Sequence, residues 1–295
     1  MMHELKELMP KWCEDNNTKY SLLLSDDIDS FMCSIIEKEL FNREINYFLD
    51  VNYEKANWNS YGKQMLYGTN DNLDWNNIIG LDMALEGEIK CWDNHVVKKD
   101  KSDKVNPNSA NLNAITNISS SNYTDKFIVS SFITMLSYYD YDITTWDKDQ
   151  LAVLCAIDGV YHPFINPSFK EKGRKNLAIL EYEFLADFIE ENLSYIIYVE
   201  NQLNLKYGKI WVNEEGYLET NIDLLGLELI FSDIFKTSFN LSDLRFRELK
   251  SYKSKYVNFE GKNSKYNKDI LNVKDRMINF ALTYKSKGIV SYNMD

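Results

Sequence analysis

Short apolar runs alternate with segments of helical spacing over the first part of the chain. Residues 20–25 form a compact apolar run without alternation, which is typical of a strand buried on both faces. Residues 30–40 place apolar side chains at helical spacing, and 45–51, 77–82 and 88–92 have the composition of further strands. This order predicts an α/β protein with a mainly parallel sheet flanked by helices.

The remainder of the chain has a more helical pattern. After a polar loop with one short helix over 98–125, helices are predicted within 127–139 and over 148–154. The longest helical pattern, 177–203, predicts a single connector helix, and 209–219 predicts a β-hairpin. We therefore place a domain boundary near residue 200, with a larger domain over 1–200 and a smaller C-terminal α+β domain over 201–295.

The charge of the chain is unevenly distributed. The net charge is −12, yet the stretch from Arg245 to Lys287 holds twelve basic and four acidic residues and carries +8. The rest of the chain therefore carries −20, which argues against broad wrapping of duplex DNA. The basic stretch is better suited to guiding a polyanion locally.

Aromatic residues interleave with the basic ones in this stretch. Basic groups can follow a phosphate backbone while aromatic rings stack on bases, so we expect a substrate-binding role for Arg245, Arg247, Lys250 and Lys253. The alternative is a solvated helix face with the aromatic residues in the core, followed by a lysine-rich loop that contains Lys262, Lys265 and Lys268.

The cellular location and the absence of membrane contact are predicted from segments that the sequence lacks. No stretch reaches about 18 consecutive apolar residues, and the first residues lack the apolar core of a signal peptide. The four cysteines are scattered and form no metal or disulfide pattern, which predicts a cytoplasmic protein without membrane contact. Cys91 lies in an apolar run and is expected to be a buried strand residue rather than a nucleophile. The bias towards Asn, Tyr and Lys is typical of low-GC genomes, viral ones among them.

Polar side chains with metal-binding chemistry follow several of the apolar runs. These residues are Asp27 and Asp29, Asp82, Asp93 with His95, and Asp158. The last follows Leu154, whose surroundings fit either a strand or the end of the helix over 148–154. Carboxyl ends of parallel strands meet at one edge of a sheet, so we expect these groups to converge. Carboxylates with an imidazole suit Mg²⁺ or Mn²⁺, and a metal pair would clamp a phosphate and activate water. Alternatively, each aspartate caps the helix that follows it.

The same segments resemble the motifs of the DHH phosphoesterases. Ser25-Asp26-Asp27-Ile28-Asp29-Ser30 looks like the D-x-D-x-D-G motif of RecJ-type exonucleases, and Asp93-Asn94-His95 resembles the signature Asp-His-His. Asp82 and Asp158 resemble the aspartates of the second and fourth motifs, and the similarity covers residues 20–165.

The resemblance implies a catalytic centre with two Mn²⁺ ions, or Mg²⁺ in their place. By resemblance, the metal ligands are Asp27, Asp29, Asp82, Asn94 and Asp158, with Asp82 bridging both ions. His95 stands at the position usually near the substrate phosphate, so His95 and Asp82 are the residues expected to carry the chemistry. The substrates of the family include single-stranded DNA, short oligonucleotides and small nucleotides.

Two departures from the family pattern give a second hypothesis. Leu23 or Ser25 stands where the family often has a ligand, and Asn94 replaces a histidine. The leading hypothesis is a metal-dependent phosphoesterase that hydrolyses phosphodiester bonds of single-stranded nucleic acid, short oligonucleotides or small nucleotides. The alternative is a divergent, inactive relative that keeps the fold and acts in nucleic-acid or nucleotide binding or in assembly. A homodimer is compatible with either.

Overall fold

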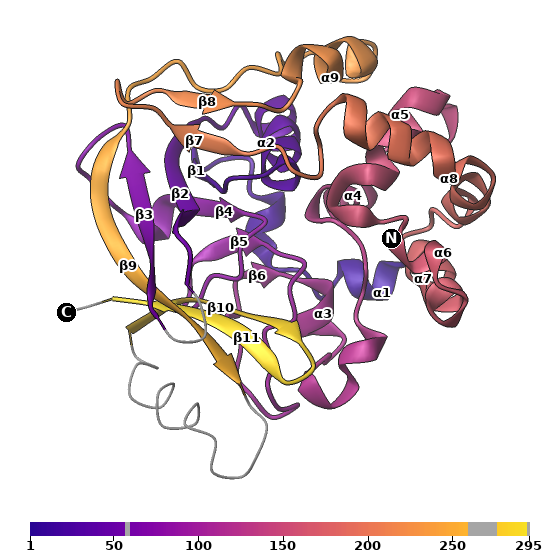
Figure 1. Cartoon of the computed structure of the whole chain (residues 1–295), viewed down its shortest axis with the longest axis horizontal. Helices are drawn as coiled ribbons and strands as arrows, with labels where there is room; N and C mark the ends of the chain where they lie inside the picture. Colours follow the sequence, from indigo (N-terminus) through magenta and orange to yellow (C-terminus); the bar gives the residue numbers. More distant parts are fainter. Residues whose placement is uncertain (57–59, 259–275, 294–295) are drawn as a thin grey trace. The chain divides into compact units, whose positions relative to one another are not determined.

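The chain divides into two compact units, each built from three separate segments. The computed structural model describes residues 1–56, 60–258 and 276–293 (Figure 1). The helical unit contains Met1–Leu8, Asp27–Glu44 and Phe127–Asp243, and the sheet unit contains Met9–Asp26, Ile45–Lys126 and Leu244–Asp295. Both units use residues from either side of position 200, and a functional boundary at that position stays a prediction.

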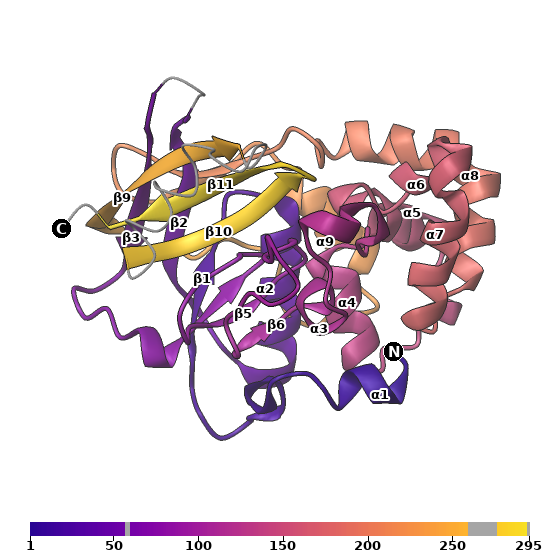
Figure 2. The same cartoon turned by 90° about the horizontal axis from the view of Figure 1, so that it is seen from below.

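A nine-stranded sheet forms the sheet unit within the described residues (Figure 2). The strand order is β10-β11-β9-β3-β2-β1-β4-β5-β6. Neighbours from β2 to β6 are parallel, and β10, β11, β9 and β3 extend the sheet in antiparallel pairs. The α/β class is therefore confirmed. The bounds are β1 Ser21–Leu24, β2 Ile45–Glu54, β3 Gly62–Gly68, β4 Ile78–Leu81, β5 Lys90–Trp92, β6 Ser109–Ala110, β9 Arg247–Asn258, β10 Met277–Tyr284 and β11 Lys287–Tyr292.

Burial explains why the central strands could be recognised in the sequence. Leu22, Leu23 and Leu24 of β1 are fully buried, as expected for a strand covered on both faces. One apolar core of this unit joins Leu23 to residues of β2, β3, β4 and β5, and also to Tyr252 of β9 and Ile278 of β10. Residues that are distant in sequence thus share one core.

The basic C-terminal stretch forms strands where it is described. The alternative of a solvated helix face is wrong for β9, because this segment pairs with β3 on one side and β11 on the other. Tyr252 and Ser254 are buried while Lys253 between them is exposed, which is the period-2 pattern of a strand. The predicted lysine-rich loop with Lys262, Lys265 and Lys268 lies outside the described residues.

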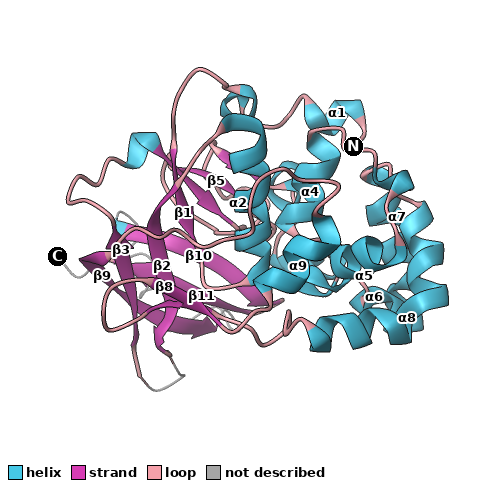
Figure 3. Ribbon diagram, turned by 90° about the horizontal axis from the view of Figure 1, so that it is seen from above, coloured by secondary structure: helices cyan, strands magenta, loops and turns pink. Residues whose placement is uncertain are grey.

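The helical unit contains most of the described helices (Figure 3). Within it, α2 packs against α4, and α5 packs against α8. The β7–β8 pair confirms the predicted hairpin. The bounds are α1 His3–Lys6, α2 Ile28–Phe41, α4 Ser131–Tyr138, α5 Lys148–Ala156, α6 His162–Ile165, α7 Pro167–Ile179, α8 Phe184–Gln202, α9 Leu224–Phe231, β7 Ile210–Val212 and β8 Leu218–Thr220, while α3 Leu112–Ile115 belongs to the sheet unit.

The predicted connector helix over 177–203 is wrong as one element. The chain leaves α7 after Ile179 and re-enters a helix at Phe184. Glu181 adopts a left-handed conformation with φ 62°. Its amide donates to Ala178 O and the Tyr182 amide donates to Leu177 O, each at 2.9 Å. This is the Schellman arrangement, which ends a helix by bonding its last carbonyl groups.

The helices can be judged against the length and apolarity that crossing a membrane requires. None of those in the described residues is long and apolar enough to span a bilayer.

Candidate functional site at the strand ends

Three polar residues follow the adjacent parallel strands β4, β5 and β6 at equivalent positions. Leu81 pairs with Trp92, and Trp92 pairs with Ala110. The residues that come next are Asp82, Asp93 and Asn111. The register therefore places them in one row at the carboxyl edge of the sheet, which is where ligands bind in open α/β sheets.

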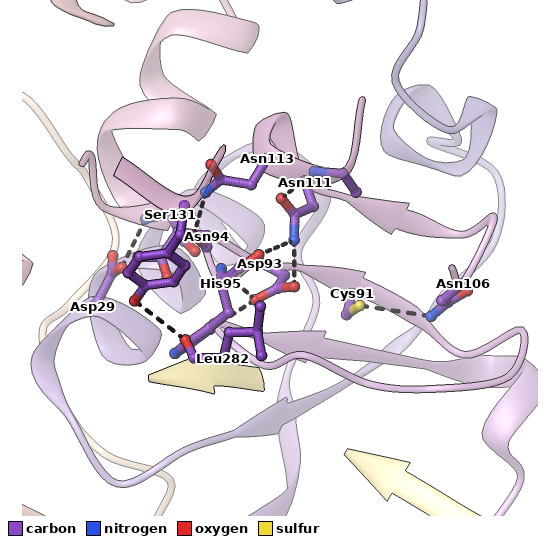
Figure 4. Close-up of polar contacts among 12 residues, drawn as sticks. Asp29, Cys91, Asp93, Asn94, His95, Asn106, Asn111, Asn113, Ser131 and Leu282 are labelled. Carbon is purple, nitrogen blue, oxygen red and sulfur yellow. Dashed lines mark hydrogen bonds and ion pairs between the residues drawn. The ribbon is translucent and has the colours of Figure 1, made fainter. Parts of the chain in front are cut away.

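Asp93 holds the ring of His95 in a fixed orientation (Figure 4). Its Oδ1 lies 2.8 Å from His95 Nδ1 and also accepts the His95 backbone amide at 3.0 Å. Because a carboxylate oxygen accepts hydrogen bonds, this contact places a proton on Nδ1 of the His95 ring. The other ring nitrogen, Nε2, points away from Asp93. Asp93 is 3% exposed, whereas the His95 side chain is 41% exposed. The pair therefore presents an oriented imidazole to solvent.

Two asparagines fix the loop around this pair (Figure 4). Asn111 Nδ2 donates to Asp93 Oδ2 at 2.5 Å and to His95 O at 2.8 Å, and its Oδ1 caps α3 by accepting the Ala114 amide. Asn113 Nδ2 donates to Asn94 O at 2.7 Å. Asp93 was among the residues expected to converge, whereas Asn111 and Asn113 were missed in the sequence, because a strand of two residues, β6, gives no periodic signal.

Asp82 adopts a left-handed backbone conformation directly after β4. Its φ is 53°, in the left-handed region that non-glycine residues rarely adopt, and the residue is 9% exposed. Aspartate and asparagine adopt this region more readily than other non-glycine residues, and Asp140 and Asn117 share it. The conformation therefore describes a tight turn after β4.

Asp27 and Asp29 belong to the helical unit and bind helix termini. Asp27 is the N-cap of α2 and accepts the Ser30 amide at 3.2 Å. Asp29, which is 2% exposed, accepts the Ser131 amide at 2.7 Å and the Phe132 amide at 2.8 Å (Figure 4). The capping interpretation therefore describes Asp27, and Asp29 binds the first turn of α4 rather than its own helix.

Asp158 also belongs to the helical unit, in a turn after α5. The strand alternative for its segment is wrong, because α5 extends to Ala156 and a short 3₁₀ turn follows. Asp158 is exposed with φ 52°, and Gly159 has φ 66°. The helix ends because Ile157 leaves the helical region with ψ 127°, and the two left-handed residues then turn the chain.

The fit of these residues to a metal pair is uneven. Asp27, Asp29 and Asp158 lie in the helical unit, and Asp82, Asn94 and His95 lie in the sheet unit. Among the described residues, no group of three or more His, Cys, Asp or Glu side chains is arranged to hold a metal ion. Both oxygens of Asp29 accept backbone amides, which fits a cap better than a ligand. Asp82 and Asn94 retain suitable oxygen chemistry.

Cys91 has the environment of a core residue. It is fully buried in β5, and burial together with the nearby Asp93 carboxylate raises the pKa of its thiol to about 12. The thiolate is the nucleophilic form, so this environment suppresses reactivity. The expectation that Cys91 is a buried strand residue is confirmed.

The predicted substrate-binding residues lie at or in β9, on the surface of the sheet unit. Arg245, Arg247, Lys250 and Lys253 are all exposed. Arg247 Nε lies 2.8 Å from Asp71 Oδ1, so part of this charge is balanced within the chain.

Comparisons with known proteins add no relative. No protein family, no curated protein and no solved structure matches this chain.

Proposed function

We propose that this chain is a phosphoesterase that hydrolyses phosphodiester bonds in single-stranded nucleic acid, short oligonucleotides or small nucleotides. The observation that carries the proposal is the oriented pair of Asp93 and His95, which Asn111 supports at the carboxyl ends of β5 and β6. The order of the acidic motifs along the chain, with their resemblance to the DHH phosphoesterases, supports the same reaction class.

His95 is the proposed acid–base residue. With Nδ1–H donating a hydrogen bond to Asp93, the protonated ring would transfer its Nε2 proton to the leaving oxygen of the phosphodiester as water attacks phosphorus and releases a proton to solvent. The Asp93 carboxylate would stabilise the imidazolium form and keep the ring from rotating. Asp93 is therefore a positioning residue, and Asn111 keeps Asp93 in place.

A divalent ion, with Mn²⁺ foremost and Mg²⁺ as the alternative, is part of the proposal. Asp82 and Asn94 of the sheet unit would contribute oxygen ligands to it. When bound, such an ion polarises the phosphoryl oxygen and lowers the pKa of an attacking water.

Hydrolysis of bis(p-nitrophenyl) phosphate and of a short oligonucleotide, with and without Mn²⁺, tests the proposal. His95→Ala should lower kcat by roughly 10²- to 10⁴-fold, the usual contribution of a positioned acid or base. His3→Ala, at an exposed histidine near the N-terminus, is the matched control and should leave kcat unchanged. Asp93→Asn should lower kcat as well, because an amide can turn its NH₂ group to Nδ1 and no longer fixes the orientation of the His95 ring. Full activity in His95→Ala would overturn the proposal.

A second candidate is a protein that keeps the fold and binds nucleotides without hydrolysing them. It is favoured by the helix-capping roles of Asp27 and Asp29, which give both carboxylates a structural task. Calorimetric binding of an oligonucleotide, together with no turnover in Mn²⁺, would select it over the enzyme. Cytoplasmic location and a homodimer are compatible with both candidates and belong to the proposals.

A further inference from the structure

Two lysines of β9 converge on an exposed tyrosine ring in the sheet unit. Tyr61 precedes β3 and is 52% exposed. Lys253 Nζ lies 5.4 Å from the centroid of its ring, and Lys255 Nζ lies 5.0 Å away. Since β3 and β9 are paired neighbours, one sheet surface carries both cations and the ring. We call Tyr61, Lys63, Lys253 and Lys255 the tyrosine–lysine platform.

The platform gathers positive charge from two neighbouring strands. Lys63 stands directly opposite Lys253 in the β3–β9 register and opposite Glu54 in the β2–β3 register. Lys253 and Lys255 lie two residues apart on β9 and so share one face of the sheet. Strand β9 has four basic residues and only one acidic residue, Glu248, in a chain whose net charge is −12. The positive charge is thus concentrated on one strand.

The exposed ring of Tyr61 indicates which class of anion the platform would bind. Lysines alone would suit any polyanion, but the half-exposed Tyr61 ring adds the capacity to stack on a planar base once Lys253 and Lys255 turn from the ring to phosphate groups. Base pairs within a duplex bury their faces in the stack, whereas an unpaired base offers its face to a tyrosine. Phosphate groups on either side of that base would meet Lys253 and Lys255.

We propose that the tyrosine–lysine platform binds single-stranded nucleic acid, with one base stacked on Tyr61 and the flanking phosphates on Lys253 and Lys255. The role of this surface rests on the proposed function, because the bound strand would be the substrate or a continuation of the substrate. The proposed binding surface thus contains Tyr61, Lys63 and Lys255 in addition to the four basic residues that the sequence predicts to bind substrate.

The test is fluorescence anisotropy with a labelled short oligothymidylate, measured on the His95→Ala chain so that hydrolysis cannot alter the ligand. Tyr61→Ala should weaken binding by roughly tenfold, the usual effect of losing one stacked base, and Tyr61→Phe should retain affinity. Lys253→Ala combined with Lys255→Ala should reduce the slope of log K against log salt by about 1.4, for two lost phosphate contacts on a single strand.

A second lysine–tyrosine pair provides the matched control. In the helical unit, Tyr207 is 71% exposed and Lys206 Nζ lies 5.6 Å from its ring centroid. Tyr207→Ala and Lys206→Ala should leave oligothymidylate affinity unchanged. Each variant should unfold thermally at the same midpoint as the parent chain, which would show that its fold is intact. Substitutions at surface positions usually change stability little.

Two results would overturn the inference. One is unchanged affinity in Tyr61→Ala, and the other is equally tight binding of polyphosphate or an abasic strand, which have no base to stack. If the platform binds oligothymidylate but the wild-type chain hydrolyses nothing, the inference stands and the proposed function fails. If the chain hydrolyses phosphodiesters while Tyr61→Ala binds normally, only the inference fails.

Discussion

Asp29 shows how one carboxylate can have two competing explanations at the scale of a residue. Its position in the sequence motif predicts a metal ligand, whereas its hydrogen bonds to the Ser131 and Phe132 amides describe a cap on α4. Anionic groups at a helix N-terminus are stabilised by the unpaired amides and the helix dipole. The two explanations differ in what happens when the carboxylate is removed without any metal present.

Asp29→Ala should lower the free energy of unfolding by about 1–3 kcal/mol, because two buried amides lose their acceptor. The measurement is urea unfolding in EDTA, followed by far-UV circular dichroism. Glu191→Ala, at an exposed position of α8, is the control and should change stability by less than about 0.5 kcal/mol. Unchanged stability of Asp29→Ala in EDTA, combined with lost Mn²⁺-dependent activity, would instead favour the ligand role.

The sequence could predict capping by Asp27 but not the partner of Asp29. The Asp27 cap joins two residues that are three positions apart, so the local sequence is enough to predict it. The Asp29 bonds join residues 102 and 103 positions apart, and only tertiary packing brings them together. The bond from Asn111 to Asp93 likewise depends on the register of β5 and β6, which no local pattern specifies.

Elements were predictable where their own burial produced a periodic pattern. Strand β1 and helix α2 lie close to the ranges expected from apolar spacing. The break between α7 and α8 escaped detection because apolar residues continue through it. Leu180 is fully buried and Tyr182 nearly so, while the residue that ends the helix is Glu181, which gives no warning of a left-handed conformation. Glycine is the usual residue at that position.

Glu181→Gly should therefore raise the free energy of unfolding by about 0.5–1 kcal/mol, since glycine adopts φ near 62° without steric cost. Chemical denaturation of the full chain measures the change. The exposed Glu181 side chain also lies 3.3 Å from the N-terminal amine. Glu181→Gln separates the two effects, because it removes the charge and keeps a side chain that is strained in this conformation. Destabilisation in both variants would show that the ion pair outweighs the backbone strain.

At the scale of the whole molecule, the order of segments along the chain differs from their grouping in space. A core of the sheet unit combines Leu23 near the N-terminus with Tyr252 and Ile278 near the C-terminus. Local composition could separate an acidic body from a basic end, but it could not show that the basic end completes the sheet. The final strands therefore have a structural role beside any role in binding.

Truncation after Asp243 should disrupt the sheet unit. The shortened chain lacks β9, β10 and β11, so it exposes the edge of β3 and loses Tyr252 and Ile278 from the core. Large core truncations cost about 2–5 kcal/mol each, and two such losses approach the whole stability of a typical domain. Limited proteolysis should cut the truncated chain within β1–β6, and adding residues 244–295 as a separate peptide should restore protection.

Deletion of Met1–Leu8 is the control for this experiment, because that segment belongs to the helical unit. It should leave the protease resistance of β1–β6 at the level of the full chain. If residues 1–243 instead unfold cooperatively at the midpoint of the full chain, the sheet unit does not depend on its last three strands. That result would favour an independent N-terminal domain, as the boundary near residue 200 predicts. Loss of protection that the added peptide reverses would show that both ends of the chain build one folding unit.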